Sequence, residues 1–477
     1  MYKFYLIVGS QLLYGDEIIK RVEKNAKLLA STMKTSYQIE YKGIIMSNDD
    51  TRNVIIAANS DANCAGIITW CHTFSPSKLW INGLKLLQKP WLHLHTQLNE
   101  CIPNEEIDMN YMNLHQSAHG DREHGFIANR IHAKRKIIVG HYKDAKVIEK
   151  ISNWQQICVA AMECANLRIV RLGDNMREVA STDGDKIEAQ IKLGWQVNTY
   201  QLSELVDYID KVTDSETNKK FSEYKEKYIL KTDNIESVKY QIKCEIALKR
   251  MLEHHGAKAF TDNFEDLTGM KQLPGLAAQE LMAQGYGFGG EGDWKVAGLC
   301  RIFKAIGKTA TFMEDYTYDF QNGLILGSHM LEICPSIAVN KPAIEVHDLF
   351  VGGKDAPARL VFNGKAGQGK ILSLVDVGGR YRLIVLSVSC VEPTQTMPNL
   401  PVPRVMWKPE PSLEVSAECW LLAGGSHHVV LVYDIDEESL IDFGRIMDIE
   451  VVCINKDTNF VSFEKELELS NLVWKLK

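Results

Sequence analysis

The segment GYGFGGEGDW (285–294) combines closely spaced glycines with two acids, Glu291 and Asp293. Three of its glycines have the G-x-G-x-x-G spacing of a dinucleotide-binding loop: Gly285, Gly287 and Gly290. That loop follows a strand, whereas the residues before this one, LAAQELMAQ, have a helical pattern that Gly285 is expected to end. An exposed turn with capping acids is a further reading. We favour a hinge-like glycine loop that delivers both acids to one point before a helix beginning at Trp294.

Further acids and histidines stand within apolar segments later in the chain. Glu314 lies in TFMEDYTYDF, a pattern suited to a β-strand, where a buried acid needs a cation or hydrogen-bond donors. His329 follows a glycine in GSHML, and His427 and His428 follow a Gly-Gly pair in LLAGGSHHVVLV. Two glutamates and a histidine pair are suitable ligands for one divalent cation, although each histidine taken singly is also explained as a hydrogen-bonded core residue.

The elements that must position these residues change along the chain. In the first third, apolar runs alternate with helical stretches, which predicts a parallel, doubly wound sheet with ligands near the carboxyl ends of its strands. A long helix at 144–166 leads to a second α/β unit. Beyond about residue 309, short β-rich segments predict an antiparallel sheet or barrel, completed by a helix at 437–448 and a final strand at 449–454.

These changes of pattern predict three domains and the fold class α/β. The expected domains are an N-terminal doubly wound α/β domain at 1–168, a central α/β domain at 169–309 and a β-rich C-terminal domain at 310–477.

Composition excludes several classes of partner. The 477 residues carry a formal charge of −7 without a basic patch, which argues against nucleic acid and anionic membranes. No window approaches the roughly 18 apolar residues of a membrane span, and the first residues lack a secretory signal. The eleven cysteines are scattered without a C-x-x-C motif, as is typical of reduced core cysteines. We therefore expect a cytoplasmic protein.

Many long segments, in this order, closely resemble the L-arabinose isomerase family over nearly the whole chain. The resemblance is carried by GYGFGGEGDWK, FMEDYTY, LGSHMLEICPS and LAGGSHH, and also by GSQLLYG, HTFSPSKLW, HTQLN, MNLHQSAHGDRE, GDNMREVASTDGDK, FEDLTGMKQLPGLA and GGKDAPARLVFN. It implies a metal-dependent aldose–ketose isomerase that converts L-arabinose to L-ribulose through an ene-diol. Conversion of D-galactose to D-tagatose is the implied side activity. A hydride shift between the two carbons is the mechanistic alternative.

The resemblance also implies a role for particular residues. The implied ligands of one divalent metal, usually Mn²⁺ with Co²⁺ or other divalent ions as substitutes, are Glu291, Glu314, His329 and His428. Glu291 and Glu314 are the implied catalytic acid and base, without an assignment of which is which. The implied substrate-binding residues are Gln11, Met176, Phe264, Val351 and, from a neighbouring subunit, His119. A site shared in this way implies a homohexamer.

Several alternatives stay open from the residues. His427 is the alternative to His428, because neighbours on a strand face opposite ways. His93 and His95 share one strand face and could form a metal pair, but the resemblance gives them no such role. A related isomerase for another aldose such as L-fucose, or a non-catalytic sugar-binding protein, are the competing functions. Val351, where the family often has Ile, leaves the preference among aldoses open.

Overall fold

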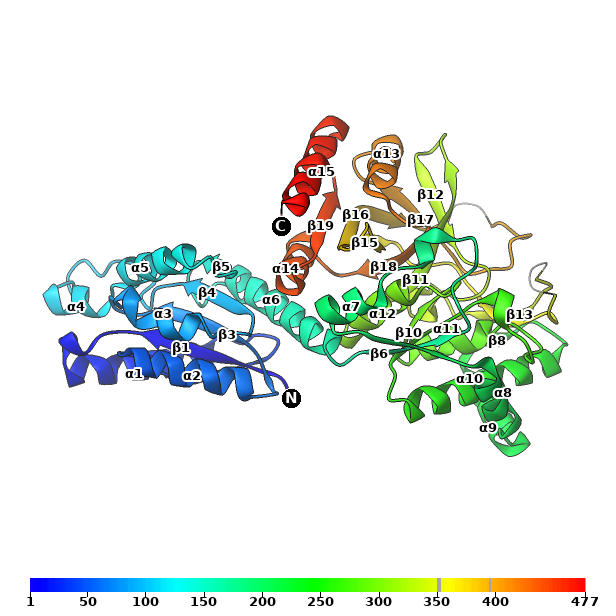
Figure 1. Ribbon diagram of the computed structural model, residues 1–477, viewed down its shortest axis with the longest axis horizontal. Helices are drawn as coiled ribbons and strands as arrows, with labels where there is room; N and C mark the ends of the chain where they lie inside the picture. The colour runs from blue at the N-terminus through cyan, green and yellow to red at the C-terminus, as the bar shows by residue number, and fades with distance from the viewer. Residues whose placement is uncertain (350–352, 394–395, 477) are drawn as a thin grey trace. The chain divides into compact units, whose positions relative to one another are not determined.

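The computed structural model describes residues 1–349, 353–393 and 396–476, in two compact units, Met1–Met162 and Glu163–Lys477 (Figure 1). Each unit has its own hydrophobic core. The second unit contains both a parallel α/β part and a β-rich part, described in turn below. The domain borders at 168 and 309 stay a prediction.

The first unit is built on a five-stranded parallel sheet with the strand order β2-β1-β3-β4-β5. The strands are β1 (Lys3–Gly9), β2 (Gln38–Ile45), β3 (Cys64–Cys71), β4 (Trp91–His95) and β5 (Lys136–Val139). The helices are α1 (Asp16–Thr32), α2 (Asn48–Ser60), α3 (Ile81–Leu84), α4 (Met109–Leu114), α5 (Ser117–Arg130) and α6 (Ala145–Cys164).

Helices cover both faces of this sheet, which explains why the sequences of its strands are continuous apolar runs. On one face, Tyr5 and Ile7 of β1 belong to a core cluster with residues of α2, α3 and α5. On the other face, Phe4 contacts Trp154 of α6, with ring centroids 5.3 Å apart. The predicted doubly wound α/β architecture is confirmed here.

The second unit begins with a four-stranded parallel sheet in the order β10-β9-β6-β7. The strands are β6 (Arg168–Leu172), β7 (Gln196–Tyr200), β9 (Ala259–Asp262) and β10 (Gly287–Gly289). The helices are α7 (Lys186–Leu193), α8 (Leu202–Asp210), α9 (Asp214–Lys227), α10 (Ile235–His254), α11 (Gly275–Ala283) and α12 (Trp294–Ala305). Asp293 begins α12 by accepting hydrogen bonds from the Lys295 and Val296 amides.

The glycine-rich segment is a short strand followed by a tight turn. Gly285 follows α11 with φ +93°, as expected for a glycine that ends a helix. The hinge-like loop expected after it is wrong, because Gly287–Gly289 form β10 and pair with β9. A Cβ atom on Gly287 would lie 2.0 Å from the carbonyl oxygen of Ala297. The glycines therefore let α12 pack directly against β10.

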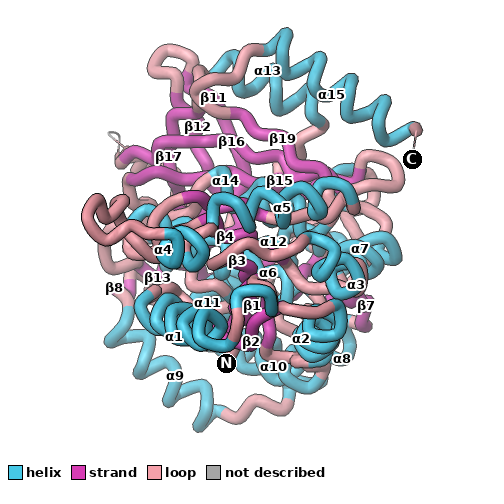
Figure 2. Tube along the Cα trace, turned by 90° about the vertical axis from the view of Figure 1, so that its left-hand side faces the viewer, coloured by secondary structure: helices cyan, strands magenta, loops and turns pink. Residues whose placement is uncertain are grey.

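The β-rich part contains a seven-stranded sheet in the order β15-β18-β11-β12-β17-β16-β19. Its strands are β11 (Ala310–Asp319), β12 (Leu324–Ser328), β15 (Gly367–Asp376), β16 (Tyr381–Val391), β17 (Arg404–Pro409), β18 (His428–Tyr433) and β19 (Glu450–Ile454). All neighbours are antiparallel except β16 and β19, and a further pairing of β15 with β16 closes six strands into a ring. Figure 2 shows β11, β12, β16, β17 and β19 in magenta. The expected antiparallel sheet or barrel is confirmed.

A small sheet and three helices complete the second unit. The small sheet has the order β14-β13-β8, with β8 (Ile229–Leu230), β13 (Ala343–Val346) and β14 (Ala358–Val361). The helices are α13 (Leu413–Ala423), α14 (Glu437–Met447) and α15 (Phe460–Lys475). The expectation that the strand at 449–454 is the last element is wrong, because α15 follows it. Only Phe463 and Leu467 of α15 are buried, so its apolar stripe is narrow.

Within the described ranges, none of the helices combines the length and the apolar character that a membrane crossing requires.

Candidate metal centre

Strand register in the β-rich part brings an acid and two histidines together. Glu314 of β11 pairs directly with His428 of β18 on one side and with Ser328 of β12 on the other. His329 follows Ser328 immediately. The Nε2 atoms of His428 and His329 lie 3.1 and 3.6 Å from Oε1 of Glu314. Two ladders on either side of one strand therefore place both imidazoles beside the same carboxylate.

Glu291 reaches this point from the parallel sheet, in the turn between β10 and α12. Its φ is +56°, a left-handed conformation that costs a non-glycine residue about 1–3 kcal/mol and is common at functional sites. The turn is held by the Met176 amide, which donates to the Glu291 carbonyl at 3.1 Å, and by the Gly292 amide, which donates to the Asp262 carbonyl at 2.8 Å. Oε2 of Glu291 lies 3.6 Å from Nε2 of His428.

Each histidine has a second carboxylate at its other ring nitrogen. Nδ1 of His428 lies 3.3 Å from Oδ2 of Asp293, and Nδ1 of His329 lies 2.5 Å from Oε2 of Glu332. If each Nδ1–H donates to its carboxylate, each Nε2 presents a lone pair toward Glu314. A carboxylate that orients an imidazole in this way is typical of metal-binding histidines.

The surrounding acids change the proton affinity of both rings. Burial alone lowers the pKa of His428, but Asp293 and Glu314 outweigh it and raise that pKa to about 9. Burial also lowers the pKa of His329, but Glu314 and Glu332 outweigh it and raise that pKa to about 8. Burial raises the pKa of Glu314, but the two histidines lower it overall. Negative charge is therefore in excess at this centre unless protons or a cation compensate it.

A cavity of about 110 Å³ lies beside the centre, with room for several water-sized groups. Its polar lining includes Asp262, Glu291, Glu314, Tyr316, His329 and Glu332. Its apolar lining includes Phe264, Leu273, Met330, Leu331 and Leu349. Apolar walls with a few convergent polar groups are the usual form of a small-molecule site.

The other predicted residues are distributed as follows. Phe264 lines the cavity, whereas Met176 does not line it and contributes its backbone bond to Glu291. Gln11 and His119 belong to the first unit; Gln11 is half-buried, and the exposed His119 contacts the Phe74 ring. Val351 lies outside the described residues. The four predicted metal ligands thus converge, and the roles of all these residues stay predictions.

His427 also approaches the centre. Its Nε2 lies 3.7 Å from Oε2 of Glu291, and the ligand atoms of Glu291, His427 and His428 all lie within 4.8 Å of one another. Strand alternation does not separate the two rings, because β18 begins only at His428. Both rings therefore lie near Glu291, and the expectation that only one of them binds the metal stays a prediction. The His427 side chain is 43% exposed, whereas that of His428 is fully buried.

Sequence reasoning overlooked two acids of the cavity. Glu332 follows His329 by three residues in SHMLE, a short-range spacing that could have indicated a partner for that ring. Asp262 is the last residue of β9, and the carboxyl end of a parallel strand is a common ligand-binding position. Both signals were present but were weaker than the histidine and glycine patterns.

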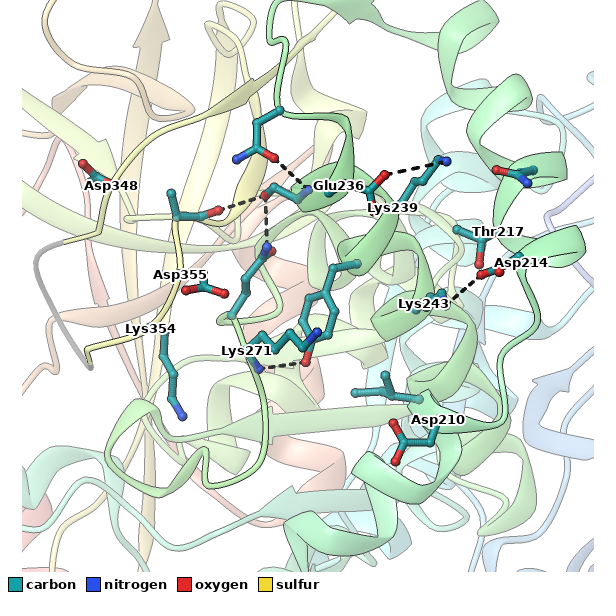
Figure 3. A pocket seen from close by; sticks show the side chains of 17 residues that line it. Asp210, Asp214, Thr217, Glu236, Lys239, Lys243, Lys271, Asp348, Lys354 and Asp355 are labelled. Carbon is teal, nitrogen blue, oxygen red and sulfur yellow. Dashed lines mark hydrogen bonds and ion pairs between the residues drawn. The ribbon is translucent and has the colours of Figure 1, made fainter.

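A larger cavity of about 1050 Å³ in the second unit lacks this chemistry (Figure 3). Three of its four lysines have polar partners: Nζ of Lys243 lies 3.1 Å from Asp214, Nζ of Lys239 lies 3.9 Å from Glu236, and Lys354 donates to the Leu267 carbonyl at 2.7 Å. Its charges compensate one another along the wall. The smaller cavity is therefore the candidate site.

The fold and the site define a class: an α/β protein with a β-rich ring whose carboxylate–imidazole centre suits a divalent cation beside a small-molecule cavity. Three family models match in succession: the L-arabinose isomerase N-terminal domain at residues 1–166, the central domain at 168–309 and the C-terminal domain at 309–450.

Curated relatives match along their whole length. The L-arabinose isomerase of Clostridium beijerinckii is 52% identical, with 99% of each chain covered. L-arabinose isomerase 1 of Bacillus licheniformis is 51% identical over 99% of this chain and 98% of its own. The L-arabinose isomerase of Thermotoga petrophila is 49% identical over 100% and 98%. The chain belongs to the L-arabinose isomerase family.

Proposed function

We propose that the candidate centre binds one divalent cation and, with it, isomerises L-arabinose to L-ribulose. Family membership supports the reaction. The observation that carries the metal is the convergence of Glu291, Glu314, His329 and His428 beside the cavity.

The donor set fits a cation. Nε2 of His428 is buried and has no hydrogen-bond partner among the described residues, although Glu314 and Glu291 face it at 3.1 and 3.6 Å. A cation between these groups would satisfy the nitrogen and offset both carboxylates. Mixed carboxylate and imidazole donors suit Mn²⁺, with Co²⁺ and other divalent ions as competitors.

A bound cation would act as a Lewis acid that stabilises negative charge on the substrate oxygens at C1 and C2. Glu291 and Glu314 both line the cavity and are the proton-transfer groups. One removes the C2 proton, whose bonding electrons form the C1–C2 double bond of the ene-diol as O1 takes up a proton. The other delivers a proton to C1, and the O2 hydroxyl loses its proton as the C2 carbonyl forms. Because His329 and His428 lower its pKa, Glu314 is a carboxylate at neutral pH and can accept a proton.

The test is ketose formation from L-arabinose after exhaustive chelation, with and without added Mn²⁺. Activity that disappears on chelation and returns with Mn²⁺ supports the proposal, whereas full activity without any divalent ion contradicts the metal assignment. Parallel assays with D-galactose and L-fucose test the side activity and the competing isomerase. Faster turnover of L-fucose than of L-arabinose would favour that alternative.

We also propose a cytoplasmic homohexamer, with Gln11, Val351 and a neighbour's His119 as substrate-binding residues. Exposed apolar side chains on α4 and on α5, the helix of His119, support a covered surface on this unit: Met109, Met112 and Phe126. Sedimentation of the wild type and of His119→Ala tests this arrangement. We expect a hexamer in both and a loss of activity in the variant, with activity partly restored when it is mixed with inactive Glu291→Gln subunits. A monodisperse, active monomer would contradict it.

A further inference from the structure

Asp262 is a buried acid for which the proposed reaction has no use. It is the last residue of β9, it is 4% exposed, and it lines the cavity beside Phe264. Its Oδ2 atom is buried without a hydrogen-bond partner in the described part of the chain. An unpartnered buried polar atom is costly, so it is retained where another molecule supplies the missing donor.

Other buried aspartates of this protein have their donors. Asp293 accepts from two α12 amides and contacts Nδ1 of His428. Asp121 accepts from the Cys71 amide at 3.0 Å and contacts two histidine rings. Asp262 differs from both in lining a cavity and lacking such donors. Structural packing therefore explains the first two and leaves Asp262 without a structural partner.

The backbone holds Asp262 in a defined position relative to the reacting groups. Its carbonyl accepts from the Gly292 amide at 2.8 Å, which ties it to the residue directly after Glu291. The facing acid of the cavity, Glu332, already contacts Nδ1 of His329 and has no donor to offer as a carboxylate. No described residue donates to Oδ2 of Asp262, so a molecule bound in the cavity is placed to supply the donor.

We propose that Asp262 determines substrate specificity by accepting a hydrogen bond from a sugar hydroxyl at C3, C4 or C5. This inference rests on the proposed function, in which the oxygens at C1 and C2 belong to the metal. A carboxyl group accepts such a bond in either protonation state, so the role does not depend on its charge. A site built around a hydroxyl strongly rejects an analogue that lacks it, because the buried acceptor is then left unpaired.

The test compares wild type, Asp262→Asn and Asp262→Ala in kcat/KM for L-arabinose and for its 3-deoxy, 4-deoxy and 5-deoxy analogues, with saturating Mn²⁺. Wild type should discriminate by about 10- to 100-fold or more against one analogue. Asp262→Ala should lose a similar factor on L-arabinose and no longer discriminate against that analogue. Asp262→Asn, which keeps an acceptor oxygen, should retain the discrimination.

Asp442→Asn is the matched control. Asp442 is a buried aspartate of α14 that pairs with Arg445 and does not line the cavity. It should leave every ratio unchanged. If Asp262→Ala does not fold, Asp262→Leu removes the acceptor while keeping the side-chain volume. Mn²⁺ affinity, measured by calorimetry, should be the same in all variants.

Unchanged discrimination in the folded alanine or leucine variant would overturn the role of Asp262. An equal loss on all four sugars, together with weaker Mn²⁺ binding, would overturn it in favour of a structural role. Under either of these outcomes, wild-type activity on L-arabinose would still support the proposed function. A wild type without ketose production would instead refute the proposed function itself.

Discussion

The two units each contain a buried cluster of histidines and carboxylates, and the clusters differ in their ratio of acids to donors. In the first unit, one acid, Asp121, contacts Nε2 of His93 at 3.0 Å and Nδ1 of His95 at 2.8 Å, and it also accepts from the Cys71 amide. In the second unit, four acids surround two rings. The members of that cluster are Glu291, Asp293, Glu314, Glu332, His329 and His428.

Buried rings with and without a neighbouring acid differ in proton affinity. Asp121 raises the pKa of its neighbour His95. Burial lowers the pKa of His72 to about 3 and that of His124 well below its usual range, so both are neutral core residues. In the second unit the acids raise the pKa values of His329 and His428 to about 8 and about 9 despite burial. Histidine content alone therefore does not identify a metal site. We infer the metal site from an excess of acids over internal donors.

The largest expected effect comes from neutralising the acids of the second cluster. Glu291→Gln and Glu314→Gln should each reduce kcat for L-arabinose by about 10²- to 10⁴-fold or more, because each removes a proton-transfer group. Circular dichroism should show an intact fold. Glu245→Gln, which alters a buried glutamate of α10 away from the cavity, is the control and should retain activity. A fully active Glu291→Gln or Glu314→Gln protein would remove that residue from the acid–base pair.

Chelation should separate the two clusters. Removing Mn²⁺ should destabilise the second unit by about 2.7 kcal/mol relative to protein with metal at 100 times its Kd. Hydrogen exchange is the measurement, with faster exchange expected in β11 and β18 and unchanged exchange in β1 and β3. Equal acceleration in both units, or none in either, would argue against a metal confined to the second cluster.

The pH dependence of metal binding should follow the raised histidine pKa values. Below about pH 8 both rings of the metal-free centre carry protons that the cation must displace, so Mn²⁺ affinity should rise by up to 100-fold per pH unit and level off above about pH 9. Calorimetry in buffers of different ionisation enthalpy measures the released protons. Pairing of the protonated rings stabilises the metal-free protein below their unfolded pKa, and this contribution is lost as pH rises through 8–9. A pH-independent affinity would contradict this account.

The smallest effect is expected in the first cluster. Asp121→Asn should lower the free energy of unfolding of the first unit by about 1–3 kcal/mol. The carboxylate can pair with both histidine rings, whereas an amide has only one acceptor oxygen for them. Denaturant unfolding measures the change. Mn²⁺ affinity should not change, and Asn129→Ala, at an exposed position of the same helix, is the stability control. A weakened metal affinity in Asp121→Asn would show that the two clusters are not independent.

The periodicity and the types of the residues were sufficient to predict the fold class and part of the candidate site. Continuous apolar runs predicted the parallel strands, and Asp293 with the following apolar residues predicted the start of α12 at Trp294. The types of Glu314, His329 and His428 suggested metal ligands before their positions were known. These features are local, because they depend on backbone propensity, capping and side-chain chemistry.

Only the tertiary structure decided which of these residues meet. Glu314 faces His428 because β11 pairs with β18 in one particular register, and a one-residue shift would turn the side chain to the other face of the sheet. β10 was missed because three residues rich in glycine carry almost no strand signal until β9 pairs with them. Asp262 was overlooked because an unpartnered oxygen is visible only when every neighbour is in place. Local interactions thus determine the elements, whereas pairing between distant segments determines the site.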